Sequence, residues 1–165
     1  MQQVAKMRNM TAIYLKCDDK LLLLYRQGSV VADEMWIGAA GGHFEPEELN
    51  DPKACVLREM KEELGLSEDS IKNLQLRYIT LRNVKGEVRQ NFYFFADLED
   101  GEQKELTSNE GVLKWFTLQE LQGLNMPFSA RYMMDHYVEK GQFDDSLYGG
   151  ISDGNKVVFT KMQEG

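Results

Sequence analysis

The stretch that most constrains the fold is Gly41–Leu66, GGHFEPEELNDPKACVLREMKEELGL, which predicts a strand end, a loop, a helix and a stop. Asp51 suits the N-cap, because its carboxylate can accept the unpaired N–H groups of the first helical turn. Pro52 suits the first helical position, where no backbone donor is needed. Gly65 suits the C-terminal stop, which often requires a left-handed residue.

Apolar residues inside this helix recur at helical spacing and define one face. They are Ala54, Leu57, Met60 and Leu64. At about 100° per residue, three carboxylates fall on the side opposite Leu57 and Leu64. They belong to Glu59, Glu62 and Glu63.

These three carboxylates require compensation, because like charges one turn apart destabilise a helix. Glu62 and Glu63 also lie near the helix C-terminus, where the macrodipole disfavours anions. A hard divalent cation such as Mg²⁺ would compensate, since it prefers carboxylate oxygens and keeps waters that phosphate can replace. The alternative is a solvated face of salt bridges to Arg58 and Lys61, which is common on surface helices. Helix chemistry taken by itself favours this solvated face.

A wider pattern resembles the signature of the Nudix hydrolases, which is Gly, five residues, Glu, seven residues, then Arg-Glu-aliphatic-x-Glu-Glu-x-Gly-aliphatic. The matching residues are Gly42, Glu48, Arg58, Glu59, Glu62, Glu63, Gly65 and Leu66. Nine residues rather than seven separate Glu48 from Arg58. The extra residues fall before the helix, in a loop that tolerates insertion better than a helix does. This loop must bulge to keep Glu48 in place.

The resemblance implies an α/β (α+β) fold, namely an α/β/α sandwich with a mixed β-sheet. It also implies hydrolysis of a nucleoside diphosphate linked to another group, with Mg²⁺ (or Mn²⁺) as cofactor. At 165 residues the chain is expected to form a single domain over residues 1–165.

By match to the signature, the candidate metal ligands are Glu59, Glu62, Glu63 and the carbonyl oxygen of Gly42. Arg58 is expected to pair with Glu48 and to hold the loop against the helix, since a guanidinium fork matches a carboxylate better than an ammonium does. Gly65 completes the motif as its stop.

The general base stays open among Glu62, Glu63 and Glu110. Glu110 lies in the loop before a predicted strand, where many Nudix enzymes carry a glutamate that binds metal or acts on the attacking water. The alternative is a solvated loop side chain, because a catalytic carboxylate must reach the site.

The resemblance to purine-nucleotide enzymes suggests substrate contacts from the segment before a C-terminal helix and from the early strands. The candidate substrate-binding residues are Arg26, Trp36, Asn125 and Phe128, with Met126 beside them. Trp36 has a second interpretation as a core residue.

The early strands and the NEG…WF segment resemble the MutT-like branch, which hydrolyses oxidised or normal nucleoside triphosphates to monophosphate and pyrophosphate. An 8-oxo-dGTP-type substrate is therefore expected. The runner-up is an ADP-ribose or nucleotide-sugar pyrophosphatase. A different class of function, a non-catalytic nucleotide-sensing module, stays open.

Composition limits the kinds of partner and the cell compartment that we expect for this chain. The net charge of −8 argues against stable nucleic-acid binding, which uses basic surfaces. The longest apolar run, Leu21–Tyr25, is too short to cross a membrane, and the start MQQVAKMRNM resembles no secretory signal. The expected compartment is cytoplasmic, and the expected state is a monomer or homodimer.

The cysteines and histidines suggest neither a disulfide framework nor a zinc site. Cys17 and Cys55 are too few for such a framework and are interpreted as reduced, inert thiols. His43 and His136 do not form a ligand pattern with them.

Periodicity and turn residues predict the remaining elements. Strands are expected over Met10–Leu15, Lys20–Arg26, Met35–Ala40, Leu74–Thr80, Gln90–Leu98, Val112–Phe116 and Val157–Lys161. The four leucines after Lys20 predict a strand buried on both faces. Helices are expected over Thr117–Leu124 and Pro127–Lys140, and loops over Gly28–Glu34 and Asp97–Glu105.

Overall fold

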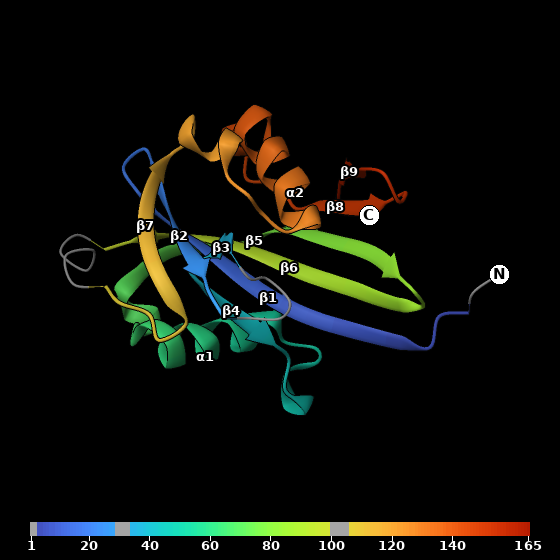
Figure 1. Cartoon of the computed structure of the whole chain (residues 1–165), viewed down its shortest axis with the longest axis horizontal. Coiled ribbons are helices and arrows are strands. Elements are labelled where there is room, and N and C mark those ends of the chain that lie inside the picture. The colour runs from blue at the N-terminus through green and yellow to red at the C-terminus, as the bar shows by residue number, and fades with distance from the viewer. Residues whose placement is uncertain (1–2, 29–33, 100–105) are drawn as a thin grey trace.

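A computed structural model describes residues 3–28, 34–99 and 106–165, and it places two α-helices on opposite faces of a mixed sheet (Figure 1). The strands are β1 (Lys6–Cys17), β2 (Lys20–Arg26), β3 (Met35–Gly38), β4 (Ala40–His43), β5 (Ile71–Val84), β6 (Glu87–Leu98), β7 (Gly111–Thr117), β8 (Tyr148–Ser152) and β9 (Val157–Lys161). The helices are α1 (Pro52–Leu64) and α2 (Phe128–Glu139). Short 3₁₀ segments are η1 (Pro46–Glu48), η2 (Glu68–Ser70), η4 (Glu120–Gly123) and η5 (Gly141–Phe143). The predicted α/β/α sandwich is confirmed.

Strand β1 organises the sheet by changing partners along its length. The strand order is β3-β2-β1-β6-β5-β8-β9, with β4 paired to β1 and β7 paired to β2. The C-terminal part of β1 pairs with β2, while its residues Met10–Ile13 pair with β4. The β1–β6 and β5–β8 pairs are parallel and the others are antiparallel. The switch from β2 to β4 brings the glycine-rich segment before α1 onto the middle of the sheet.

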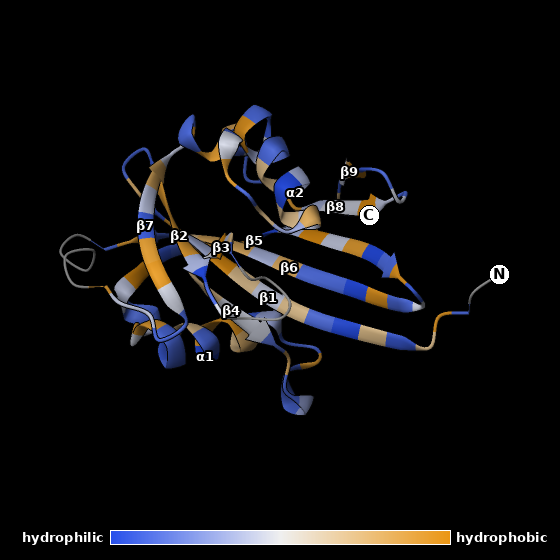
Figure 2. Ribbon diagram, viewed as in Figure 1, coloured by the Kyte–Doolittle hydropathy of each residue, from blue (hydrophilic) through white to orange (hydrophobic). Residues whose placement is uncertain are grey.

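Two apolar cores lie on the two faces of the sheet, and strand β2 contributes to both. Leu22 joins the core under α1, whereas Leu21 and Leu23 join the core under α2. All four leucines of β2 are at most 2% exposed. Each such side chain contributes about 1.5–3 kcal/mol by burial. The prediction of a strand buried on both faces is therefore confirmed, and Figure 2 shows the apolar bands of these central strands.

Helix α1 has the predicted bounds and caps. The Asp51 carboxylate accepts from the N–H of Ala54 at 3.0 Å, Pro52 is the first helical residue, and Gly65 ends the helix at φ 71°. The predicted apolar stripe is confirmed at Met60 and Leu64, and Leu57 packs against the core, but Cys55 and Val56 were not predicted. The buried residues are Cys55, Val56, Met60 and Leu64, whereas Ala54 and Leu57 are only partly buried. Helical spacing is compatible with both the predicted and the observed set of buried residues. Contact with the sheet decides which of them is buried.

Several element boundaries also differ from the predictions. The predicted strand Met35–Ala40 is two strands, β3 and β4, because the chain changes partner at Ala39. Strand β8 was not predicted, since its two glycines have low strand propensity. A Cβ at Gly150 would lie 2.5 Å from the ring of Phe159, so close packing of β8 on β9 explains the glycine.

The predicted helix Thr117–Leu124 is wrong at its start, because Thr117 ends β7 and only Glu120–Gly123 form a 3₁₀ turn. The predicted loops Gly28–Glu34 and Asp97–Glu105 lie partly outside the described residues, and the first residues of the second belong to β6. Among the described residues, none of the helices has the length and apolarity needed to cross a membrane.

A buried arginine ties the C-terminal strands to the sheet. Arg77 is 4% exposed, and its guanidinium donates to the carbonyls of Ser146 at 2.9 Å and Gly141 at 2.7 Å. It also forms a 3.2 Å ion pair with Asp144, whose second carboxylate oxygen accepts from the Tyr148 hydroxyl at 2.5 Å. These contacts hold the segment between α2 and β8 against β5.

We expect Arg77→Ala to lower the free energy of unfolding by about 3 kcal/mol, because it leaves buried acceptors unpaired. Urea denaturation checks this. The control is Lys53→Ala, which removes an exposed 3.1 Å pair with Glu68 and should change stability by at most about 0.5 kcal/mol. Equal effects of the two substitutions would contradict the assignment.

Candidate active site

Two consecutive glycines let the backbone of β4 approach helix α1. A Cβ at Gly42 would lie 2.6 Å from the Oε1 atom of Glu59. Gly41 has φ 151°, and a Cβ there would lie 2.1 Å from the carbonyl oxygen of Thr11. A larger residue at Gly42 would therefore push β4 away from α1, and one at Gly41 would push it away from β1. The Gly-Gly pair in the sequence was the signal for this close approach.

Arg58 connects helix α1 to the loop that precedes it. Its Nε lies 2.7 Å from Oε2 of Glu48 and its Nη2 lies 2.9 Å from Oε1, so the pair is bidentate. Nη2 also donates to the carbonyl of His43 at 3.1 Å. The Glu48 side chain is 7% exposed, and it accepts a further bond from the N–H of Glu45 at 2.9 Å. The longer loop therefore still brings Glu48 to the guanidinium.

The contacts of Glu48 favour its charged form. Hydrogen bonds from Arg58, and then from the N–H of Glu45, lower the pKa of Glu48 to about 2, against the opposing effect of burial. The carboxylates of Glu48 and Glu59 raise the pKa of Arg58 above its usual value, mainly through the hydrogen bond to Glu48. The Arg58–Glu48 pair, which we call the clamp, thus consists of two opposite charges at neutral pH.

The carboxylates of Glu59 and Glu63 lie together beside the glycines. Glu59 is 14% exposed and accepts from Arg58 Nη1 at 3.0 Å. Glu63 accepts from the N–H of Gly41 at 3.2 Å. Burial raises the pKa of Glu63 to about 8, followed by its hydrogen bond with Glu59, the charge of Glu59 and the charge of Glu110. Without a cation, the Glu63 carboxylate therefore takes up a proton more readily than an exposed glutamate does.

Glu62 occupies a different position from the other two motif glutamates. Its side chain is 56% exposed and pairs with Arg58 Nη1 at 3.2 Å. The structure thus brings Glu59 and Glu63 together and places Glu62 at the rim. Residues 3–28, 34–99 and 106–165 contain no cluster of three or more acidic, histidine or cysteine side chains already arranged around a metal position.

The donor set nevertheless fits a hard cation. Two carboxylates that disfavour each other's charge, together with a backbone carbonyl beside them, are the oxygen ligands that Mg²⁺ and Mn²⁺ accept. The carbonyl of Gly42 lies 3.5 Å from the Thr11 hydroxyl and 3.8 Å from the Cys55 sulfur, which are weak partners. Arg58 Nη1 lies 3.0 Å from Glu59 and 3.2 Å from Glu62, so it partly neutralises the charge of these two carboxylates.

The thiol of Cys55 lies 3.4 Å from the Thr11 hydroxyl, in surroundings that disfavour the thiolate that a nucleophile needs. Cys55 is fully buried, and burial raises its pKa to about 11. Neither cysteine forms a disulfide in the described part of the chain.

Arg26 and Glu110 meet on the other rim of the site. Their side chains form a 3.5 Å ion pair where β2 and β7 join, with Arg26 opposite Gly111. After burial and the effects of Glu59, the charge of Glu110 makes a smaller contribution to the raised pKa of Glu63. Within the described residues, the Nε of Arg26 is buried and has no acceptor. A Cβ at Gly111 would lie 2.1 Å from the carbonyl of Tyr25, which explains the glycine after Glu110.

The remaining sequence candidates form two separate groups. The Trp36 ring packs between Tyr25 and Phe116, with ring centroids 4.9 and 4.8 Å away, and the backbone N–H of Trp36 donates to the carbonyl of Asn125 at 2.8 Å. The structure therefore brings Asn125 to the strand that carries Trp36. Phe128 lies instead under Arg82, whose Cζ is 4.2 Å from the ring centroid. Sequence reasoning missed Arg82. Met126 is 7% exposed and belongs to the core under α2.

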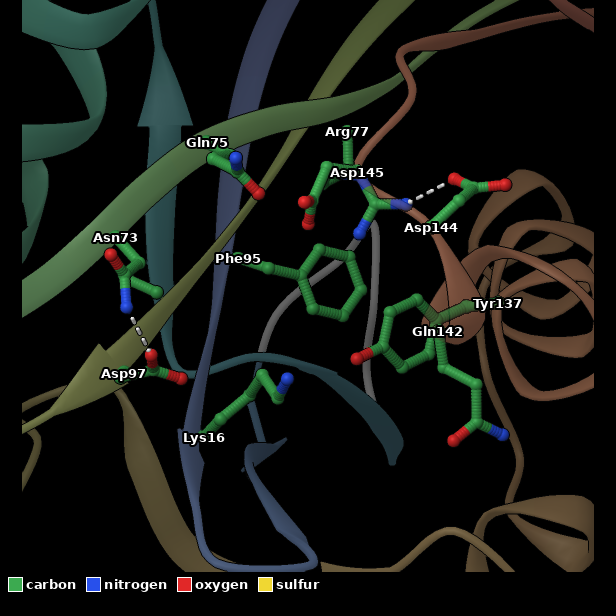
Figure 3. Close-up of a pocket in the computed structure, with 11 residues that line it drawn as sticks. Lys16, Asn73, Gln75, Arg77, Phe95, Asp97, Tyr137, Gln142, Asp144 and Asp145 are labelled. Carbon is green, nitrogen blue, oxygen red and sulfur yellow. Dashed lines mark hydrogen bonds and ion pairs between the residues drawn. The ribbon is translucent and has the colours of Figure 1, made fainter.

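A polar pocket lies elsewhere, beside Phe95 and Tyr137 (Figure 3). Two pairs of its polar side chains contact each other, namely Arg77 with Asp144 and Asn73 with Asp97 at 2.8 Å. None of the sequence-predicted site residues lines it. We therefore regard it as part of the C-terminal structural network.

Helix α1 presents carboxylates to a strand that carries two glycines, with the Arg58–Glu48 clamp and Glu110 beside them. This arrangement is that of metal-dependent hydrolases acting on phosphoanhydrides. The NUDIX domain family matches residues 6–137 of the chain. The chain therefore belongs to the Nudix family, and this membership classes it as a Nudix pyrophosphohydrolase. Members of this family generally use divalent metal ions and act on small nucleotide substrates.

Solved structures show the same fold at low sequence identity. The mutator MutT protein from Bacillus halodurans is 24% identical with a TM-score of 0.67, and the match covers 96% of this chain and 99% of that one. The MutT protein from Methanosarcina mazei is 17% identical with a TM-score of 0.67, covering 83% and 96%. A C. elegans Ap4A hydrolase is 18% identical with a TM-score of 0.61, covering 85% and 100%. No curated protein sequence matches the chain.

We expect the Arg58–Glu48 clamp to make stability depend on pH in acid. The pKa of Glu48 is lowered, from about 4.3 in the unfolded chain to about 2 in the folded one. Its stabilising effect is therefore complete above pH ~4.3 and disappears as pH falls toward ~2. Glu48→Gln should lower the free energy of unfolding at pH 7 by about 2 kcal/mol, and this difference should shrink with acidification.

Denaturant titrations at pH 7, 5, 4 and 3 test this expectation. The matched control is Glu68→Gln, which changes an exposed glutamate away from the clamp. A pH-independent difference between wild type and Glu48→Gln would contradict the clamp's electrostatic character.

Proposed function

We propose that this protein hydrolyses nucleoside triphosphates to the monophosphate and pyrophosphate, with an oxidised purine substrate such as 8-oxo-dGTP. The observation that supports the chemistry most directly is the Glu59–Glu63 pair, held against Gly41 and Gly42 and bordered by the Arg58–Glu48 clamp. Paired carboxylates on one helix face serve phosphate chemistry when they bind a divalent cation.

A bound divalent cation would neutralise charge on the phosphoryl oxygens and lower the pKa of a coordinated water. Glu59 and Glu63 would hold it, with the Gly42 carbonyl as a third donor. Glu62 is the exposed member of the set, which leaves it accessible to substrate and to the attacking water. Little covalent help from the protein is needed, because phosphoryl transfer depends mainly on position and charge.

Proton transfer from the water requires a carboxylate that reaches it. Glu62, Glu63 and Glu110 are the candidates, as they were from sequence. Glu110 gains support from the structure, because its charge acts on Glu63 while Arg26 holds it at 3.5 Å. Arg58 instead acts by position, since both its strongest bonds are committed to Glu48.

The substrate class is supported by the segments around the site. Trp36 and Asn125 are joined by a 2.8 Å backbone hydrogen bond, and an aromatic ring and an amide together would suit a purine base. The MutT-like fold extends over nearly the whole chain. The ADP-ribose and nucleotide-sugar alternatives use the same carboxylate helix, so turnover on a substrate panel must separate them.

We expect Glu62→Gln and Glu63→Gln each to reduce turnover at least ~100-fold, because each removes a charge or a proton acceptor that acts in the transition state. Steady-state kinetics of pyrophosphate release measures this. Glu68→Gln is the matched control, since it removes the same charge from an exposed position. Near-normal turnover in a folded Glu62→Gln or Glu63→Gln protein would refute the corresponding role.

A nucleotide panel with Mg²⁺, Mn²⁺ or EDTA tests the substrate class. The panel contains 8-oxo-dGTP, the normal dNTPs, ADP-ribose, nucleotide sugars and dinucleoside polyphosphates. Metal-dependent pyrophosphate release from 8-oxo-dGTP well above dGTP supports the proposal. Preference for ADP-ribose would replace it with the runner-up. Nucleotide binding without turnover would favour a sensing module.

A further inference from the structure

Strand β9 forms a free edge of the sheet. The strand order of the described residues ends at β9, which is paired along one side with β8. In Figure 1, β8 and β9 lie beside α2 and away from α1. An edge strand presents a row of unpaired N–H and C=O groups with which a further strand can pair. Strand β9 is therefore a template for one more strand.

Two hydrogen bonds at the ends of the β8–β9 pair determine which backbone groups face the open side. The N–H of Asp153 donates to the carbonyl of Lys156 at 3.0 Å, and the N–H of Met162 donates to the carbonyl of Leu147 at 2.8 Å. Bonded pairs alternate along antiparallel strands, so the even-numbered residues of β9 bond to β8. The backbone groups that point to the open edge belong to Val157, Phe159 and Lys161.

The open edge of β9 has little protection against pairing. Natural edge strands are often blocked by proline or by charged side chains. Strand β9 contains no proline, and Lys161 is its one charged residue. The Nζ atom of Lys161 lies 3.9 Å from the carboxylate of Asp144 in its own chain. This charge is therefore directed over the sheet and leaves the edge accessible.

An apolar stripe crosses β8 and β9 on the face of the sheet opposite α2. Ile151 is directly opposite Val158, and their exposed fractions are 64% and 55%. Met162 lies on the same face, because a Cβ at Gly149 would be 3.7 Å from its side chain. Phe159 projects to the other face and packs against the core under α2. Among the described residues, the core under α1 includes no residue of β8 or β9, so the stripe is uncovered up to the open edge.

Two-fold symmetry limits how β9 can pair with β9 of a second copy. The two strands run antiparallel, and the groups that bond are those of the odd-numbered residues. A register centred on Thr160 meets this condition, because it sets Phe159 opposite Lys161 of the second copy. A register centred on Phe159 meets it as well. The side chains decide between the two registers.

The side chains favour the register centred on Thr160. In this register Val158 lies opposite Met162 of the second copy, and Lys156 lies opposite Glu164. Apolar pairs and opposite charges directly across neighbouring strands stabilise a sheet. Two-fold symmetry forms each of these contacts twice. The register centred on Phe159 would instead set Lys156 opposite Met162 and leave both charges without an opposite charge across the interface.

We propose that β9 is the interface of a homodimer, in which the edges of two chains pair antiparallel about Thr160 and join the two sheets into one. The contact uses the same edge on both copies, so assembly stops at two chains. A contact between two short edge strands is small, and the dimer is therefore expected to be reversible. The interface uses none of the carboxylates of α1, so it is independent of the proposed function.

Sedimentation velocity over a range of protein concentrations measures this association. The wild type should shift with concentration from the 19.0 kDa chain to a species of twice that mass. Lys156→Glu and Glu164→Lys should each weaken dimerisation ~10-fold, because each sets like charges opposite each other at two places. The double variant Lys156→Glu/Glu164→Lys forms both pairs again and should restore the affinity.

Lys161→Pro tests the backbone contribution. Proline removes an N–H that faces the second copy and leaves the bonds to β8 in place. Dimerisation should weaken ~10-fold or more, since two hydrogen bonds across the two-fold axis are lost. Urea denaturation at a concentration where the wild type is monomeric checks that the variant is folded.

A matched pair of variants tests the apolar stripe. Val158→Lys places a charge opposite Met162 of the second copy and should weaken dimerisation at least ~10-fold. The control is Val112→Lys, which adds the same charge to a similarly exposed valine of β7. An unchanged dimer in Val112→Lys together with loss in Val158→Lys supports the proposal.

Five outcomes would overturn the proposal. A wild type that stays monomeric up to about 1 mM has no such interface. A dimer that survives every edge variant, or that Val112→Lys weakens as much as Val158→Lys does, uses another surface. A double charge variant that does not recover contradicts the register centred on Thr160. Growth into species larger than a dimer contradicts the two-fold pairing.

Discussion

The bidentate bond between Arg58 and Glu48 is the interaction on which the site depends. It joins the helix to the loop before it, and through the His43 carbonyl it also joins the helix to the end of strand β4. It acts together with the hydrogen bond from the Gly41 N–H to Glu63, which also fixes how the glycines face the carboxylates of α1. A buried carboxylate left alone would also carry a large desolvation cost. The clamp therefore sets geometry and charge together.

The clamp permits Glu59 and Glu63 to lie close together, although two neighbouring carboxylates repel each other. Glu59 and Glu63 lie close enough that burial and mutual repulsion raise the pKa of Glu63. The helix accepts this cost because Val56 and Met60 anchor it to the sheet through fully buried contacts. Apolar burial on one side of the helix thus holds two carboxylates close together on the adjacent side. A divalent cation would relieve the repulsion between them.

Local chemistry explains how much of this could be predicted from sequence. The caps at Asp51 and Gly65 determine helix α1 to the residue, because each satisfies a specific backbone requirement. The buried face of α1 could not be fixed this way, since Leu57 and Val56 both fit helical spacing and only the sheet discriminates between them. Strand β8 escaped prediction because pairing with β5 and β9, not propensity, makes Gly149 and Gly150 extended, and Gly150 packs closely against Phe159.

Pairs that depend on sheet register were out of reach for the same reason. Arg26 and Glu110 are far apart in sequence, and the register of β2 with β7 brings their side chains to 3.5 Å. Trp36 and Asn125 are likewise joined by a 2.8 Å backbone hydrogen bond that no sequence pattern indicates. The motif determines which carboxylates helix α1 carries, but the pairing of strands decides which other side chains lie beside one another.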